Sequence, residues 1–222
     1  MVREFIQYCT FSAQVTLGIG FLLWLVRYRS LPGTLQRLGP FLILSILTQF
    51  VSVYLSRQKI PNLFLLHIYT VLEWVCWAFF YAYLLHPTRF FRTYWPLLTT
   101  IVTALLIANS IWLEPLEGFN SNAKTFVQLL LLGASISYFF QSFGRIDLSR
   151  PVPFALILIN FAVLIYYSGS LFIFMFSKIL NQYQVDFGQQ RLFWAINGLL
   201  YVLFVLLILI SIWKAAFRKT TS

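Results

Sequence analysis

Charged residues are scarce in this chain. Only 10% of the 222 residues are Asp, Glu, Lys or Arg, whereas 60% are hydrophobic and the mean hydropathy is +0.80. About a quarter of a soluble domain is charged, and a chain of this length could not hide so much apolar surface from water. We therefore expect an integral membrane protein with lipid around most of its surface.

Cysteine and histidine occur only twice each, which argues against several kinds of site. Cys9 and Cys76 belong to different hydrophobic segments and fall at different depths, too far apart for a disulfide. His67 and His86 are too few for a three-histidine zinc site. They also lie at opposite ends of one segment, so they cannot hold a haem between facing helices. We expect no metal and no cofactor.

Signatures of catalysis are also missing. The last hydrophobic segment has no lysine before Lys214 that could carry a Schiff base. His67 and Glu73 could in principle assist a serine, but the chain contains no G-x-S-x-G nucleophile elbow. Phosphate loops and dinucleotide fingerprints are absent from the sequence too. The sequence disfavours an enzyme without excluding one, and it predicts no catalytic residue.

Apolar segments of a length that can cross the bilayer as helices recur along the chain. They predict an all-α polytopic membrane protein, one domain over residues 1–222 built as a single bundle of seven transmembrane helices. The shorter second segment should extend into its flanks or cross a thinned region of the bilayer. All eight prolines should lie between helices or on first turns, where a missing N–H matters little. The expected spans are 5–26, 41–56, 62–85, 95–113, 125–143, 154–177 and 192–213.

Lysine and arginine are distributed unevenly between the two sides of this bundle, ten against six. The richer side should be cytoplasmic, which predicts an N-out/C-in orientation. Because the charges are spread over short connections, we expect no nucleic-acid partner. The richer side holds Arg27, Arg29, Arg37, Arg89, Arg92, Arg145, Arg150, Lys214, Arg218 and Lys219, and the other side holds Arg3, Arg57, Lys59, Lys124, Lys178 and Arg191.

Glu73 is the one carboxylate expected deep in the bilayer, halfway along the third segment. An ionisable group there is costly and indicates function. It could stay ionised against a cationic ligand or ion, or be held protonated and switch on losing its proton. It could instead be a hydrogen-bonded acid that ties its helix to the neighbouring helices.

Other polar residues of the segments gather toward the predicted outer half. If their side chains converge, they would line an outward-facing pocket with Glu73 at its floor, a setting typical of small-ligand recognition. Alternatively, they join helices pair by pair, and His67 bonds to a neighbouring helix. Small residues at 18–20, 133–135 and 168–170 predict close helix packing. The candidate ligand-binding residues are Glu73, His67, Tyr69, Thr70, Trp74, Gln49, Asn197 and Tyr166.

The run from Asn62 to Trp74, which contains His67, Tyr69 and Glu73, resembles small seven-helix membrane proteins of Bacteroidota with no established activity. The final segment also resembles theirs, with Asn197-Gly198 and the closing Ile212-Trp213-Lys214. Such proteins often occur near sensor histidine kinases, so the resemblance implies a sensory or accessory membrane role, and it implies a bacterial inner (plasma) membrane as the location.

Three functions remain open from the sequence. The first is a receptor-like or sensory protein that binds a small or lipidic ligand from outside and acts through a membrane or cytoplasmic signalling partner. The second is a small proton- or ion-coupled transporter that uses Glu73. The third is a structural subunit of a membrane complex. In each case membrane lipid surrounds the chain.

Overall fold

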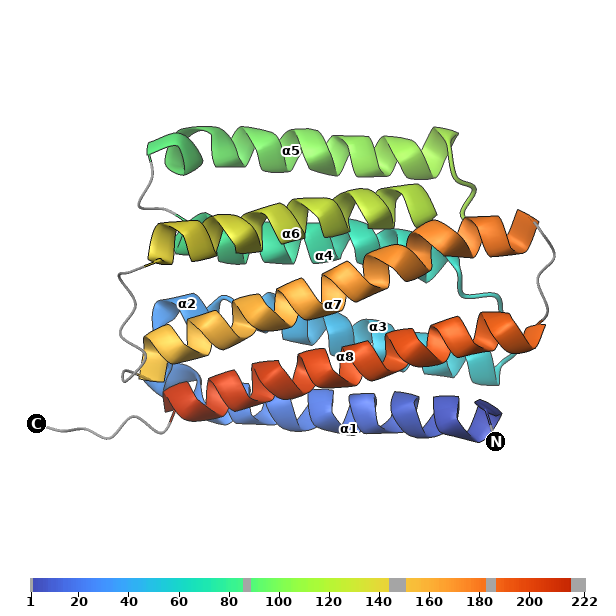
Figure 1. The fold of residues 1–222 in the computed structure, drawn as a ribbon, viewed down its shortest axis with the longest axis horizontal. Helices are drawn as coiled ribbons and strands as arrows, with labels where there is room; N and C mark the ends of the chain where they lie inside the picture. The colour runs from blue at the N-terminus through green and yellow to red at the C-terminus, as the bar shows by residue number, and fades with distance from the viewer. Residues whose placement is uncertain (1, 86–88, 144–150, 183–186, 217–222) are drawn as a thin grey trace, which may run out of the picture.

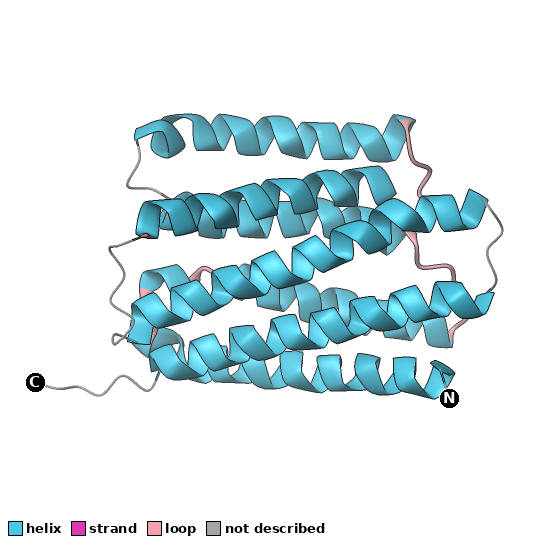
Figure 2. Cartoon of the chain, viewed as in Figure 1, coloured by secondary structure: helices cyan, strands magenta, loops and turns pink. Residues whose placement is uncertain are grey.

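The structure is a computed structural model in which residues 2–85, 89–143, 151–182 and 187–216 are described. Over these residues the chain is all-helical and contains no strand (Figure 2). Helix follows helix through short connections (Figure 1). The elements are α1 (Val2–Arg27), η1 (Tyr28–Ser30), α2 (Gly33–Gln36), α3 (Gly39–Arg57), α4 (Phe64–Leu84), α5 (Arg89–Trp112), α6 (Ser121–Ser142), α7 (Pro151–Gln182) and α8 (Phe187–Ala216).

Seven helical segments of the described chain are long and apolar enough to cross a membrane, which confirms the predicted number. The short second segment does extend into its flank, because α2 and α3 together span 25 residues. The segments are Gln7–Ser30, Gly33–Arg57, Phe64–Leu84, Thr93–Trp112, Ser121–Ser142, Val152–Phe176 and Leu192–Ala216.

Two predicted boundaries are wrong. Since α5 begins at Arg89, Pro96 lies inside that helix and not on its first turn. Neighbouring groups in a membrane bundle can satisfy a carbonyl that a proline frees, so such a helix persists. The predicted loop 178–191 is largely helical, because α7 continues to Gln182 and α8 starts at Phe187. Polar residues there extend the two helices beyond their apolar spans. Pro87 lies outside the described residues.

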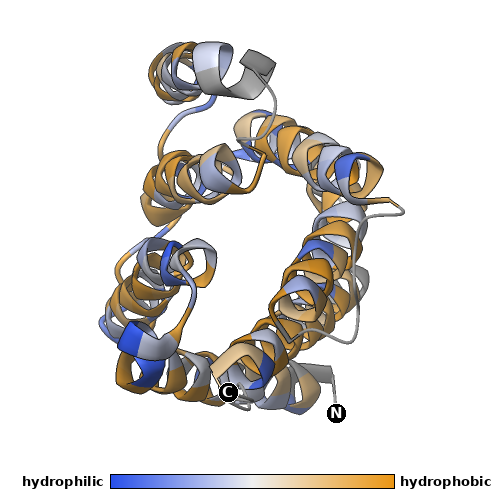
Figure 3. Cartoon of the chain, turned by 90° about the vertical axis from the view of Figure 1, so that its left-hand side faces the viewer, coloured by the Kyte–Doolittle hydropathy of each residue, from blue (hydrophilic) through white to orange (hydrophobic). Residues whose placement is uncertain are grey.

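Six of the spanning helices close a ring. Each packs on the next in the order α1, α8, α7, α6, α4 and α3, and α3 returns to α1. The fifth helix, α5, lies outside this ring, mainly against α4 and more sparsely against α6. Figure 3 looks along the helices, with α5 uppermost, and colours much of the ribbon as hydrophobic. Many large hydrophobic side chains of the described helices are exposed, among them Phe50, Ile111 and Phe140. An apolar exterior is what lipid contact requires.

Aromatic side chains fill one half of the ring. Trp77 of α4 is fully buried and packs against Phe41, Tyr81, Tyr167 and Phe204, with ring centroids 4.8 to 6.4 Å apart. These rings come from four different helices of the ring. Open space lies toward the end of the bundle that carries the N-terminus, here called the N-terminal end.

The small-residue clusters differ in what they contact. A Cβ on Gly169 would lie 2.5 Å from the side chain of Leu200, so α7 and α8 approach closely there, as expected. In contrast, a Cβ on Gly18 or Gly133 would meet nothing within 4 Å. The expectation of close packing is therefore wrong at these two glycines, which leave space at the helix surface.

Candidate functional site

Glu73 lies at the centre of a buried polar cluster that joins three helices. The ammonium group of Lys124 in α6 donates a hydrogen bond to Glu73 Oε2 and forms an ion pair with it. The Tyr167 hydroxyl in α7 donates to Glu73 Oε1 at 2.9 Å. Each carboxylate oxygen therefore has a partner on a different helix. These are the contacts of an acid that ties helices together, while the ligand and proton-switch interpretations stay predictions.

The predicted position of Lys124, in a connection between helices, is wrong. It lies on the first turn of α6, and its side chain is 2% exposed. Long basic side chains near a helix end usually reach outward to the membrane surface. This one reaches inward, and its ammonium group lies over the rings of Tyr69, Tyr167 and Phe174, 5.0 to 5.9 Å from their centroids. Cation–π contacts of this kind stabilise a desolvated cation.

The connection before α6 explains why this helix begins early enough to include Lys124. Glu114 is buried, and its carboxylate accepts a hydrogen bond from the Asn122 backbone N–H at 3.0 Å. It also accepts one from Asn109 Nδ2 at 2.8 Å. A carboxylate at a helix start satisfies free N–H groups and complements the helix dipole. The sequence held a signal for this start, because Asn120-Ser121 is a typical N-cap pair.

His67 fixes the same connection from the side of α4. Its Nδ1 lies 3.0 Å from Ser110 Oγ, and its Nε2 lies 3.3 Å from the Gly118 carbonyl oxygen. The side chain is 2% exposed. These contacts agree with the alternative in which His67 bonds to a neighbouring helix.

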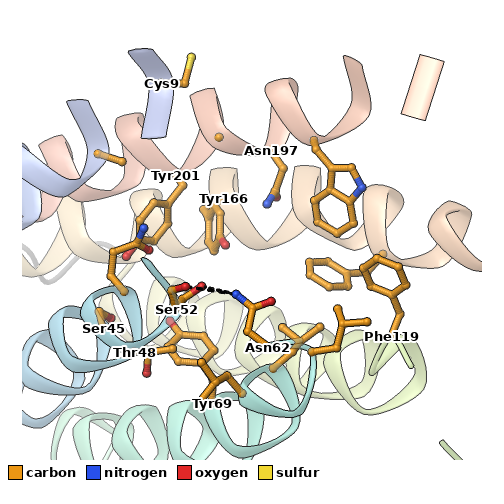
Figure 4. A pocket seen from close by; sticks show the side chains of 18 residues that line it. Cys9, Ser45, Thr48, Ser52, Asn62, Tyr69, Phe119, Tyr166, Asn197 and Tyr201 are labelled. Atoms are coloured by element: carbon orange, nitrogen blue, oxygen red, sulfur yellow. Dashed lines mark hydrogen bonds between the residues drawn. The ribbon is translucent and has the colours of Figure 1, made fainter. Parts of the chain in front are cut away.

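A cavity of about 460 Å³ occupies the ring at its N-terminal end (Figure 4). Its walls come from α1, α3, α4, α7 and α8 and from the connections before α4 and α6. All of the described lining side chains are uncharged, and six of them are aromatic: Tyr69, Phe119, Tyr166, Phe174, Trp194 and Tyr201.

Polar groups point into this cavity from facing helices. In Figure 4 the side chains of Tyr69, Tyr166, Tyr201 and Asn197 are directed toward the same space. Asn197 Oδ1 is buried and has no hydrogen-bond partner among the described residues. Because a buried polar atom without a partner costs about 1–3 kcal/mol, this amide oxygen leaves bonding capacity for a ligand.

An aromatic cluster lies at the end of the cavity nearest the connections. Phe119 stacks on Trp194, with ring centroids 5.7 Å apart and an angle of 17° between the ring planes. Phe174 meets the same tryptophan edge-on at 5.6 Å. Since Phe119 directly follows Gly118, the His67 contact also helps to hold this ring in place.

The structure brings together only part of the predicted site. Gln49, Tyr69, Tyr166 and Asn197 line the cavity. The other four predicted residues lie outside the lining. Glu73 binds Lys124 and Tyr167. His67 contacts the connection between α5 and α6. The Thr70 hydroxyl donates to Leu66 O at 2.7 Å, and Trp74 Nε1 lies 3.4 Å from Thr99 O.

Sequence reasoning missed two features of the site. It missed Lys124, although a lone carboxylate in the bilayer calls for a cationic partner. It also missed the aromatic lining residues Phe119, Phe174 and Trp194, whose apolar side chains carry no distinguishing signal. Glu73 was predicted to form the floor of the pocket, but it does not line the cavity. The rings of Tyr69 and Phe174 lie between the cavity and Lys124, the ion-pair partner of Glu73.

Comparison with protein-family models, curated proteins and solved structures found no match to this chain.

Proposed function

We propose that this chain is a receptor-like membrane protein that binds a small uncharged ligand in the cavity at its N-terminal end. The observation that carries the proposal is an aromatic cavity whose described lining is entirely uncharged, with Asn197 Oδ1 lacking a partner among the described residues. An amide oxygen accepts hydrogen bonds, so the ligand should present a donor such as a hydroxyl or amide.

Charge is the property on which the cavity discriminates most sharply. An ion that enters a site of low dielectric loses its hydration, and aromatic faces return only part of that cost to a cation, so full compensation needs a nearby opposite charge. Lys124 and Glu73 already neutralise each other behind Tyr69 and Phe174, and these two rings already face the Lys124 ammonium. A neutral molecule with an apolar body loses little on entering and gains aromatic contacts.

The orientation that suits this function is N-out/C-in, with the cavity on the outer side of a bacterial inner membrane. Because Lys124 is buried, it no longer counts among the Lys and Arg residues of the connections. The count on the two sides of the bundle then changes from ten against six to ten against five, which strengthens this orientation. The count includes Arg145, Arg150, Arg218 and Lys219, which lie outside the described residues. Short connections between the described helices favour output through a separate signalling protein.

Three probes with the same ten-carbon chain and different head charge test the proposal: decanol, decanoate and decyltrimethylammonium. The protein is reconstituted in lipid discs, and its thermal unfolding is followed as each probe is added. Decanol should raise the unfolding temperature, because a ligand that binds only the folded state stabilises it. The two charged probes should bind at least about ten-fold more weakly, a difference of about 1.4 kcal/mol.

Asn197→Leu should remove the response to decanol, because it replaces the unpartnered amide and fills space. The matched control is Ser168→Leu on α7, which makes a similar change at an exposed position outside the cavity lining. Equal stabilisation of Asn197→Leu and wild type would contradict binding in the cavity. Stronger binding of either charged probe would contradict the assignment of an uncharged ligand.

The position of the ion pair favours proton-coupled transport as a second candidate function. Two of the three rings that the Lys124 ammonium contacts, Tyr69 and Phe174, also line the cavity. The test is ligand-dependent proton movement across proteoliposomes. A carrier should lose this movement in the double variant Glu73→Gln/Lys124→Met, which leaves no unpaired charge. Unchanged proton movement in that variant, or its absence in wild type, argues against the carrier.

A further inference from the structure

A second cavity, of about 500 Å³, lies between α4, α5 and α6, outside the six-helix ring. It is a crevice beneath the sparse contact of α5 with α6. Trp74 and Trp95 form its base, Leu98 and Ile101 line the side of α5, and Gly133 and Ser137 line the side of α6.

The polar groups of these lining residues bond within the protein. Trp95 Nε1 donates to Ala78 O at 2.8 Å, and the Ser137 hydroxyl donates to Gly133 O at 2.7 Å. Trp74 Nε1 is directed to Thr99 O at 3.4 Å. The two indoles therefore present their apolar faces to the crevice, which suits a hydrocarbon better than water or a polar ligand.

The depth of the crevice identifies the source of its occupant. Every lining residue belongs to one of the membrane-crossing segments Phe64–Leu84, Thr93–Trp112 or Ser121–Ser142. At that depth the surrounding solvent is the hydrocarbon of the bilayer. What enters from outside the protein is therefore a lipid chain or a helix of another membrane protein.

The volume decides between these two. A helix with its side chains is about 10–12 Å across and rises about 5.4 Å per turn, so one turn fills roughly 400–600 Å³. The crevice could hold about one turn, too little to dock a membrane-crossing partner helix. A flexible acyl chain can follow a narrow space between helices along its length.

We propose that this crevice binds one acyl chain of a membrane phospholipid, which fills the gap between α5 and the ring. Gly133 makes the site possible, because a Cβ there would meet nothing within 4 Å and any larger side chain would occupy the crevice. The bound chain bridges α5 and α6 and completes the packing that the protein lacks there. This proposal is independent of the ligand bound in the other cavity.

The experiment compares Gly133→Leu with Gly18→Leu in the whole chain. Both glycines are helical, and both would place a new Cβ in open space, but only Gly133 lines the crevice. The purified proteins are stripped of lipid in detergent and titrated with dioleoylphosphatidylcholine. Retained phospholipid is measured by native mass spectrometry and stability by thermal unfolding.

Wild type and Gly18→Leu should bind the phospholipid in roughly equimolar amount and gain stability from it. Gly133→Leu should bind at least about ten-fold more weakly and should be as stable without lipid as with it. Ile101→Trp fills the crevice from α5 and should act in the same way if Gly133→Leu fails to fold. Equal lipid binding by wild type and the folded filling variants would overturn the proposal, as would a wild-type oligomer that either filling variant dissociates.

Discussion

The ammonium group of Lys124 and the Oε2 atom of Glu73 form an ion pair in which the two side chains are 2% and 1% exposed. The lysine backbone lies at the start of α6, whereas Glu73 lies near the middle of α4, so the aliphatic stem of the lysine spans the difference in depth. The pair links two neighbouring helices of the ring, and Tyr167 adds α7. Three of the six ring helices thus meet at one carboxylate.

A double-mutant cycle should show that the two charges depend on each other. Lys124→Met alone leaves a buried carboxylate without its cation, and removing one member of a buried pair typically costs about 3–5 kcal/mol. Glu73→Gln alone leaves the ammonium unpaired and should be similarly destabilising. The double variant should regain most of the loss, because replacing both charges of a buried pair is often neutral. Unfolding in mixed micelles of rising denaturing-detergent content measures these free energies.

Tyr167→Phe serves as the graded comparison in the same series. It removes one hydrogen bond to the carboxylate but keeps the ion pair, so it should cost about 1.5–3 kcal/mol. Additive losses in the Glu73/Lys124 double variant would show that the two side chains act independently and would contradict the assigned pair.

Hydropathy predicted the number of helices because lipid allows few alternatives to a long apolar helix. Helix ends were harder to predict, since polar residues can extend a helix beyond the hydrocarbon. The residues 178–182 continue α7, and Arg89 begins α5 well before Pro96. Hydropathy indicates which part of each helix lies in the hydrocarbon, whereas the residue at which the helix ends depends on local hydrogen bonds.

The candidate site was predictable only where a residue type carries its own signal. Glu73 was identified because a carboxylate in lipid is costly, and Asn197 because amides are rare there. Lys124 was not predicted as part of the site, because hydropathy treats a lysine beside an apolar run as a surface residue. Its inward direction follows from the fold, which places α4 beside α6, and one sequence does not show that contact.

The contact of His67 with the Gly118 carbonyl should control the mobility of the connection between α5 and α6. His67→Phe removes the hydrogen bonds to Ser110 and Gly118, at a cost of about 1–3 kcal/mol. Amide exchange at residues 113–119 should accelerate, while exchange in α8 stays unchanged as an internal control. Decanol binding should weaken too, because Phe119 of this connection lines the cavity. Unaltered exchange at 113–119 would show that His67 does not hold this segment.

Gly39 permits the close approach of α1 and α3. A Cβ at this position would lie 2.1 Å from a ring atom of Trp24. That ring cannot easily move away, because its Nε1 donates to Leu35 O at 3.1 Å and the side chain is buried. Gly39→Ala should therefore destabilise the protein by about 1–3 kcal/mol or more.

Gly18→Ala is the matched control for this overlap, since it adds the same methyl group where nothing lies within 4 Å. It should be neutral or stabilise by up to about 1 kcal/mol, because alanine favours a helix over glycine. Adding Trp24→Leu to Gly39→Ala should recover part of the loss. Equal stability of the two alanine variants in thermal unfolding would contradict the close approach.

Lys59 ends α3 in a left-handed conformation that suits glycine better. Its φ is 57°, and the following N–H, of Ile60, donates to the Leu55 carbonyl at 3.0 Å, as in a glycine-type helix end. A side chain in this conformation costs about 1–2 kcal/mol, part of which glycine loses again through its freer unfolded chain. Lys59→Gly should therefore stabilise the protein by about 0.5–1 kcal/mol. Lys59→Ala removes the same charge but keeps a Cβ, so it separates the backbone effect from electrostatics. The two variants are compared by thermal unfolding in the same lipid discs, and a glycine variant no more stable than the alanine variant would show that the backbone is not strained at this position.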